Sequence, residues 1–508
     1  MSCTTTLKYI FTYLAITVHL FSLAQSNVTV DKRKLEILGA DLVNYNHDRG
    51  KFQICKGNVR FKQGSMFMDC DSAYFYEEIN KVEAFGNIYI RQKDTVDLWG
   101  GYLEYDGDVG LAKVTKDVRL TDGTMKLTTE QLNYDMFDKV GYYTTGGNIV
   151  NGEDKLYSRK GTYFTRSKEF YFKDSVRLTN PEYTMDSDTL SYNTVSKIAS
   201  FYGPTYIRSE ENTIYCQYGW YNTDKEISQF SRGAYIEGKE NKLVADSMMY
   251  YRNTGLGEAY GNIKLVDTTE EITITGQYGK YERFSKLTLI TGDPVAIKNM
   301  DGDSFYLRAD TLIDEADTSL SQKRMLSAFH NVKVFKSDMQ AVSDSMIYNL
   351  SDSTVGFYTN PILWTDSNQI TGDTIIVYQS SEGLKKLEAY DNGFIVEKDI
   401  NGFFNQIKGK RLDAYFVKTK LKRVDVDGNG QSVYYALEDS ATYAGVNDVV
   451  CGKMVIRIDS STRIRTITFL NKPKATFYPL ETFPISKSKL NKFKWHSAIR
   501  PKKSIFFN

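Results

Sequence analysis

Six aspartates recur through this 508-residue sequence at equivalent places in a repeating pattern, and they are its most obvious candidates for chemistry. A pair of carboxylates can serve as acid and as nucleophile or base, as in glycoside hydrolysis. A catalytic pair occurs once in an enzyme, however, whereas six copies at one repeat period fit a turn or a strand edge better. We therefore predict a structural role for these residues, which are Asp71, Asp188, Asp246, Asp310, Asp344 and Asp373.

Patterns for metals and cofactors are weak. The four histidines lack the spacing of zinc ligands, and His330 occupies a slot that another copy fills with Gly86, which favours a structural role. Residues 301–303 and 425–430 resemble calcium loops, but the second segment has Ala436 where such a loop requires Glu. The sequence has no phosphate-binding glycine loop and no nucleophile elbow. We expect no enzyme activity, no metal and no cofactor.

The element that must position these residues is an extended strand with one apolar face. In residues 81–91, Val82, Ala84, Gly86, Ile88 and Ile90 fall on alternate positions. Period two is typical of a half-buried β-strand, because successive side chains point to opposite faces. The same order, built around Gly-Asn-Val or a close variant, recurs in residues 55–61, 259–265 and 328–334.

These strands recur with a period near 30 residues, which indicates an array of supersecondary units. From Val59 through Ile88, Val118 and Ile149 to Val176 the steps are 29, 30, 31 and 27 residues. The aspartates mark a second strand signal in each repeat, so we expect a hairpin-like pair per repeat. Alternating polarity favours antiparallel strands with one solvated face. The predicted fold class is all-β, an elongated stack of antiparallel repeats with very little helix.

Composition agrees with this fold class. Aromatic residues make up 14% of the sequence, with 37 Tyr and 28 Phe but only 8 Pro, which favours pleated, half-buried surfaces. The formal net charge is +1, yet from Lys487 onward the chain has seven cations and no acid. The remaining body is therefore mildly acidic, and its composition argues against a nucleic-acid partner.

The first 24 residues read as a secretory signal peptide. Lys8 supplies a positive start, residues 9–21 a mostly apolar core, and Ser22-Leu23-Ala24 a cleavage site of the small-x-small type. The alternative is an uncleaved membrane anchor, but the apolar run is shorter than the roughly 20 residues that a bilayer requires. We expect an exported protein that is soluble after cleavage.

Four cysteines remain after export, in a compartment that permits disulfides. Cys70 and Cys216 occupy the small position that Ala245 fills in another repeat, and Cys451 fits the same slot. Cysteines in distant repeats cannot come within the about 6 Å between Cα atoms that a disulfide needs. We predict free thiols that behave as small buried side chains, with a Cys55–Cys70 bridge as the alternative.

Two motifs used in succession resemble the LptA/OstA family, the organic solvent tolerance domain of lipopolysaccharide export. Residues 38–45, Leu-Gly-Ala-Asp-Leu-Val-Asn-Tyr, lead into Gly57-Asn58-Val59, and residues 68–71, Met-Asp-Cys-Asp, lead into the strand at 82–88. The resemblance is clearest over residues 35–150 and returns at 243–350. The chain is much longer than a single domain of this family, and no region of barrel-like length follows.

This resemblance implies a β-jellyroll or β-taco whose apolar interior shelters the acyl chains of lipid A. It implies a periplasmic bridge between inner-membrane and outer-membrane parts of the export machinery. The implied partners are lipopolysaccharide and other jellyroll components at both ends of the stack, with head-to-tail self-association as a further possibility.

The alternating pattern itself predicts an apolar inner face along the stack. Burial there of acyl chains would gain about 0.8 kcal/mol per methylene. The plainer interpretation is that the same side chains fill a closed core. The candidate ligand-binding residues that would face the trough are Val59, Phe61, Ile88, Ile90, Val118, Leu120, Ile149, Ile263, Leu265, Val332 and Val334.

Two other classes of function share a long β repeat. An exported polysaccharide-binding or polysaccharide-cleaving protein would gather exposed aromatic and acidic residues in one place rather than periodically. A structural spacer would need neither a trough nor partners at its ends.

The predicted organisation is a signal peptide at 1–24, family-like repeats at 25–190, further repeats at 191–470 and a basic, aromatic tail at 471–508. Two interpretations of the tail stay open. One is a solvated, disordered end. The other is an electrostatic contact with anionic glycolipid headgroups or an acidic partner, which salt would weaken.

Overall fold

A computed structural model describes residues 34–46, 51–92, 96–300, 303–316, 324–380, 383–399, 401–417, 420–438, 442–459 and 464–507. The predicted signal peptide lies outside these residues, as do His19 and His47. Within the described ranges, no helix has the length and apolar character needed to cross a membrane.

Strands account for 74% of the residues and pair in antiparallel fashion. Helical structure in the described ranges is limited to single 3-10 turns, so the predicted all-β fold class with very little helix is confirmed. The turns are η1 (Glu77–Ile79), η2 (Leu480–Thr482), η3 (Ile485–Lys487), η4 (Ser497–Ile499) and η5 (Lys503–Phe506).

The chain divides into two compact units, residues 1–170 and 171–508. In the first unit β3 to β8 form successive antiparallel hairpins. Its strands are β1 (Glu36–Gly39), β2 (Leu42–Asn46), β3 (Phe52–Gln63), β4 (Met66–Tyr76), β5 (Lys81–Gln92), β6 (Val96–Asp106), β7 (Leu111–Thr121), β8 (Lys126–Asp135), β9 (Val140–Tyr143), β10 (Gly147–Asn151), β11 (Asp154–Ser158) and β12 (Lys160–Phe164).

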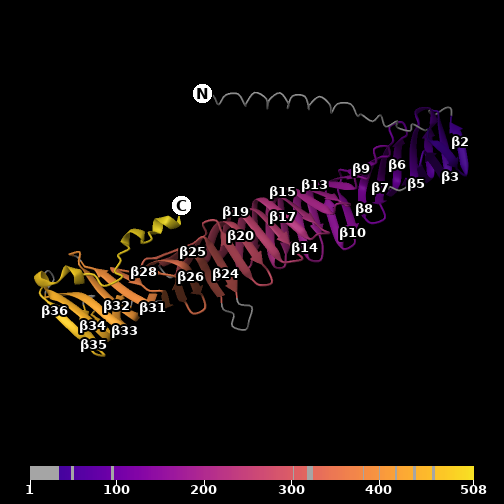
Figure 1. Cartoon of the computed structure of the whole chain (residues 1–508). Coiled ribbons are helices and arrows are strands. Elements are labelled where there is room, and N and C mark those ends of the chain that lie inside the picture. Colours follow the sequence, from indigo (N-terminus) through magenta and orange to yellow (C-terminus); the bar gives the residue numbers. More distant parts are fainter. Residues whose placement is uncertain are drawn as a thin grey trace, which may run out of the picture. The chain divides into compact units, whose positions relative to one another are not determined.

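In the second unit β14 to β20 and β31 to β34 pair in chain order, whereas between them split strands pair with more distant neighbours, as β21 does with β24 (Figure 1). From β13 onward they are β13 (Glu169–Thr179), β14 (Tyr183–Asn193), β15 (Ile198–Ser209), β16 (Asn212–Asn222), β17 (Ile227–Gly238), β18 (Asn241–Tyr251), β19 (Leu256–Asp267), β20 (Ile272–Glu282), β21 (Leu287–Thr291), β22 (Val295–Met300), β23 (Asp303–Arg308), β24 (Thr311–Ala316), β25 (Arg324–Lys336), β26 (Met339–Asn349), β27 (Thr354–Tyr358), β28 (Ile362–Thr365), β29 (Asn368–Thr371), β30 (Thr374–Ser380), β31 (Gly383–Lys398), β32 (Phe404–Val417), β33 (Lys420–Leu437), β34 (Tyr443–Ile458), β35 (Ile464–Leu470) and β36 (Lys474–Tyr478).

Many of the long strands bend near the middle, at residues with positive φ. In β5 these are Gly86 (φ 73°) and Asn87 (φ 42°), and the β5–β6 register shifts between Phe85 and Ile88. A β-bulge of this kind bends its strand and increases the local twist. The two halves of each strand thus form the two walls of a jellyroll, joined at a corner.

Elsewhere the corner breaks the strand into two short strands. After β20 the chain forms β21 and then β22, both of which pair with β20, and Pro294 lies between them. A proline cannot donate to a strand ladder, so a strand break is a site where it is tolerated. The wall is therefore continuous although the strand is interrupted.

Each unit encloses the apolar face of its strands. In the second unit one cluster of buried side chains extends from Ile272 to Ile456 and includes residues on both sides of the corners, such as Ala328 and Val332 in β25. The four cysteines of the described chain, Cys55, Cys70, Cys216 and Cys451, are buried and free, as predicted.

The tail is ordered along residues 479–507, so the interpretation of it as a disordered end is wrong. In Figure 1 it leaves β36 and runs back past β28 toward β25. Phe506 is buried beside Tyr306 and Val295 in a small cluster on the outside of β22 and β23. Contacts of this kind fix the tail against the second unit. The basic composition of the tail gave no indication of them.

Candidate functional site

The predicted trough-facing residues lie on the enclosed face of their strands. Ten of the eleven are buried, with exposed fractions from 0% for Phe61 to 9% for Ile149. Leu265 is half-buried and packs against the core of the second unit, which contains Val332 and Val334. The first seven belong to the first unit and the other four to the second. Their contact with a ligand stays a prediction.

Five of the six predicted aspartates bond to the bulge residue at a corner, whereas the sixth, Asp188, accepts from Thr189 Oγ1 at 3.0 Å. At each of several bends the Asn side chain of the bulge donates to a neighbouring Asp carboxylate, and His330 Nδ1 lies 3.1 Å from Asp344 in the same manner. With their acceptors used in this way, the carboxylates are structural, as the sequence predicts. The pairs, 2.8 to 3.1 Å apart, are Asn58–Asp41, Asn87–Asp71, Asn262–Asp246, Asn331–Asp310 and Asn392–Asp373.

A cavity of about 380 Å³ opens in the second unit, between the free ends of its walls. Its volume lies within the ~300–1,000 Å³ typical of small-molecule sites. Apolar side chains from β31 to β35 form its interior, and none of the eleven predicted residues lines it. The interior residues are Ile395, Ile407, Phe416, Leu421, Val424, Ile456, Ile458, Ile464 and Ile467.

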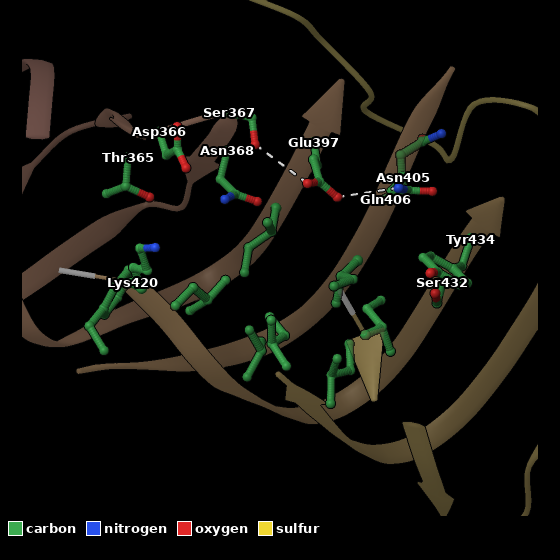
Figure 2. Close-up of a pocket in the computed structure, with 18 of the residues that line it drawn as sticks. Thr365, Asp366, Ser367, Asn368, Glu397, Asn405, Gln406, Lys420, Ser432 and Tyr434 are labelled. Atoms are coloured by element: carbon green, nitrogen blue, oxygen red, sulfur yellow. Dashed lines mark hydrogen bonds between the residues drawn. The ribbon is translucent and has the colours of Figure 1, made fainter. Parts of the chain in front are cut away.

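Polar side chains form the rim. Figure 2 shows Thr365, Asp366, Ser367 and Asn368, from the turn between β28 and β29, on the same side of the cavity as Glu397. Ser367 Oγ donates to Glu397 at 3.4 Å. Asn405 Nδ2 donates to the same carboxylate at 3.3 Å, so Glu397 links the β28–β29 turn to the start of β32.

The rim is more acidic than basic. Three carboxylates, Asp338, Asp366 and Glu397, and a single cation, Lys420, line the cavity. Asp338 is paired with Lys336 at 2.8 Å. An anionic phosphate would be poorly matched to this rim, whereas hydroxyl and amide groups can hydrogen-bond to carboxylates. The site combines an apolar interior with a rim suited to neutral polar groups.

A buried carboxylate outside the cavity has a structural explanation. Glu388 on β31 accepts hydrogen bonds from Tyr378, Tyr390, Lys386 and Arg411. Burial alone would raise the pKa of Glu388, but the hydrogen bonds from Lys386, Tyr390 and Tyr378 lower that pKa to about 2. A carboxylate held ionised by four donors is not available as a general acid or base.

The described residues contain no group of three or more His, Cys, Asp or Glu side chains placed to hold a metal. The thiols are poor nucleophiles as well, because burial raises the pKa of Cys70 to about 12.

Sequence reasoning missed the cavity. The available signal was the group of four isoleucines within residues 456–467, which lies beyond the clear Gly-Asn-Val repeats. It also missed three outward-facing glutamines, Gln340, Gln369 and Gln406, which are 4%, 1% and 0% exposed. They contact the tail, and no local pattern marks them.

Residues 32–188 match the family model of the OstA-like proteins. This range includes the first of the two regions where the sequence motifs resemble that family. A crystal structure of LptH, the LptA-homologous periplasmic component of the lipopolysaccharide transport device of Pseudomonas aeruginosa, is similar at 19% identity. The likeness covers 20% of this chain and 78% of that one, with a TM-score of 0.19. Among curated proteins, none matches this chain.

Proposed function

From an OstA-like domain at residues 32–188, we propose that this protein is a non-enzymatic carrier of lipopolysaccharide-type glycolipids. It acts in the periplasm after export. Its jellyroll walls shelter lipid A acyl chains, and the stack bridges the inner and outer membranes during outer-membrane assembly.

The observation that carries this proposal is the cavity with an isoleucine-rich interior and a polar rim. Acyl chains are unbranched and apolar, so their affinity comes from area removed from water, at about 0.8 kcal/mol per methylene. About six methylenes placed among the isoleucines would gain about 5 kcal/mol before the cost of leaving another apolar environment. The rim carboxylates would accept hydrogen bonds from sugar hydroxyls at the entrance, with the phosphates of lipid A outside this acidic rim.

The arrangement of aromatic residues favours the carrier over a polysaccharide-binding protein. Tyrosines on the outer walls contact one another across neighbouring strands, as in the Tyr202–Tyr218 and Tyr260–Tyr278 pairs. They are spread along the repeats rather than gathered beside a cluster of acids.

Photo-crosslinking tests the acyl-chain site. A photoreactive amino acid replaces Ile464, which lines the cavity, or, as the control, the neighbouring exposed Thr466. Purified protein is then irradiated with lipid A. We expect adducts from position 464 and few from 466. Equal labelling at the two positions, or none at either, would refute an acyl-chain site here.

The bridging role rests on the family match and needs a separate test. End strands such as β36, which pairs with β34, would add strands from another jellyroll or from a further copy. Deleting residues 187–244, two repeats in register, should leave a folded protein that no longer supports glycolipid export. Normal export by the folded deletion variant would contradict the bridge.

A further inference from the structure

The tail forms a strap, residues 479–507, across the outer face of one wall of the second unit. Its contacts reach from Gln406 on β32, which bonds to Ser488 and Leu490, to Arg308 on β23, whose Nη1 donates to the carbonyl of Ile505 at 2.7 Å. Figure 1 shows this course in yellow. The strap is therefore part of the folded surface.

Buried glutamines fix the strap by its backbone. Gln406 donates to the carbonyl of Ser488 at 2.7 Å and accepts from the amide of Leu490 at 2.9 Å. Gln369 does the same with the carbonyl of Lys494 at 2.8 Å and the amide of His496 at 2.6 Å. Because these bonds use the strap's main chain, its lysine side chains stay exposed, although Lys489 lies over the Phe493 ring and Lys503 over the Tyr306 ring.

The exposed side of the strap is mainly cationic, with Glu481 as its single exposed acid. From Lys487 to Phe507 it has seven cations and no acid. Among ion pairs between described residues, the only one formed by a cation of the strap joins Lys487 to Asp448, at 2.9 Å. The exposed cations are Lys487, Lys489, Lys492, Lys494, Lys502 and Lys503.

Large apolar side chains project from the same segment. Ile485 is 89% exposed, Ile499 53% and Phe507 60%. They lie on or directly after the 3-10 turns η3, η4 and η5, so each apolar side chain stands on a separate turn, with a cation within two to four residues. Phe507 keeps an edge-on contact with Tyr306, with ring centroids 5.4 Å apart. Ile485 and Ile499 belong to none of the buried clusters of the second unit, and exposed apolar side chains of this kind favour an external partner.

We propose that the strap is a docking surface for an anionic lipid bilayer. Clustered lysines are attracted to anionic lipid surfaces, and interspersed apolar side chains enter the boundary between headgroups and acyl chains. A planar partner suits single apolar side chains spread along an extended segment, whereas a protein partner would be expected to meet a continuous apolar patch. The strap touches the cavity rim at Gln406 and Asp366, but none of its own residues lines the cavity. The proposal does not depend on glycolipid carriage.

Vesicle binding tests the proposal. The full chain is sedimented with phosphatidylcholine vesicles that contain one quarter phosphatidylglycerol, at low and high ionic strength. The test variant carries Lys→Gln changes at four exposed strap lysines. The control removes the same charge from the body through Lys→Gln changes at four exposed positions. The strap set is Lys489, Lys494, Lys502 and Lys503, and the body set is Lys126, Lys225, Lys264 and Lys333.

We expect the strap variant to bind at least about tenfold more weakly than the parent, with the body variant close to the parent. A second pair isolates the apolar contribution: Ile485→Ser with Ile499→Ser, against Val195→Ser with Phe284→Ser, whose side chains are each 74% exposed. At high ionic strength, where the attraction of the lysines is screened, the strap pair should still bind more weakly than the parent. The control pair should bind as the parent does.

Three results would overturn the proposal. Equal losses in the strap and body variants would show an effect of net charge alone. Binding of the parent to neutral vesicles as strongly as to anionic ones would remove the role of the lysines. Strap-dependent binding to polyglutamate without binding to vesicles would identify an acidic protein as the partner. Crosslinking of lipid A at position 464 is measured on the same variants and is expected to be unchanged. A failure of bilayer docking can therefore be told apart from a failure of acyl-chain binding in the cavity.

Discussion

The glutamine contacts of the strap make a sharp prediction for Gln406→Leu. The parent side chain is fully buried and forms three hydrogen bonds, two with the strap and one with the carbonyl of Phe404. Leucine has a similar size, so packing is retained while the amide is lost. The carbonyl of Ser488 and the amide of Leu490 would then be buried without partners.

Each of the two unpaired groups costs about 1–3 kcal/mol, so docking of the strap should weaken by about 2–6 kcal/mol. The strap can detach without unfolding the walls, because its remaining contacts lie on their outer face. The change should therefore appear as local opening rather than as global destabilisation.

Amide hydrogen exchange measures this opening. Peptides that cover residues 484–496 should exchange about 30-fold faster or more in Gln406→Leu, since each 1.4 kcal/mol corresponds to a factor of ten. Peptides from β14 to β20 should be unchanged. The matched control is Gln217→Leu on the exposed face of β16. Parent-like protection of the strap in Gln406→Leu would refute the glutamine contact as its anchor.

Three further predictions follow from the corners, the interior and the buried carboxylate. Gly86→Ala places a Cβ against the Asp71 carboxylate at a positive φ, so we expect a loss of about 1–3 kcal/mol in the free energy of unfolding, measured by urea denaturation; an unchanged midpoint would contradict the corner geometry. Ile263→Asp buries an unpaired charge and should cost several kcal/mol in the same assay, whereas the exposed neighbour change Lys264→Asp should be nearly silent, and equal effects would show a solvated interior. The pKa of Glu388 is lowered to about 2 from an ordinary value of 4.5, so its stabilising contribution is complete above pH 4.5 and is lost as the pH falls from there toward 2; Glu388→Gln should flatten this part of the stability profile, and an unaltered slope would exclude Glu388 as its source.

Much of the wall architecture could be predicted from the sequence. The alternation around Ile88 and Ile90 places the apolar face inside, since side chains of a strand alternate strictly between its two faces. Gly86 and Asn87 mark the bend, because Gly adopts positive φ at no steric cost and Asn tolerates it better than most residues. The slot that Cys216 shares with Ala245 predicted a free, buried thiol. All of these depend on neighbours within one repeat.

The tertiary structure alone decided the two surfaces on which the proposals rest. The cavity is lined by residues of β31 to β35 and by turns from earlier in the chain, such as residues 365–368, so its existence depends on packing across the unit rather than on any one strand. The strap was equally hidden. Gln406 and Leu490 are 84 residues apart, and Gln406 occupies an outward strand position, where a polar side chain signals only solvent. Only the tertiary structure shows that the strap covers Gln406. Burial by a segment so distant in the sequence produces no periodic pattern from which it could be predicted.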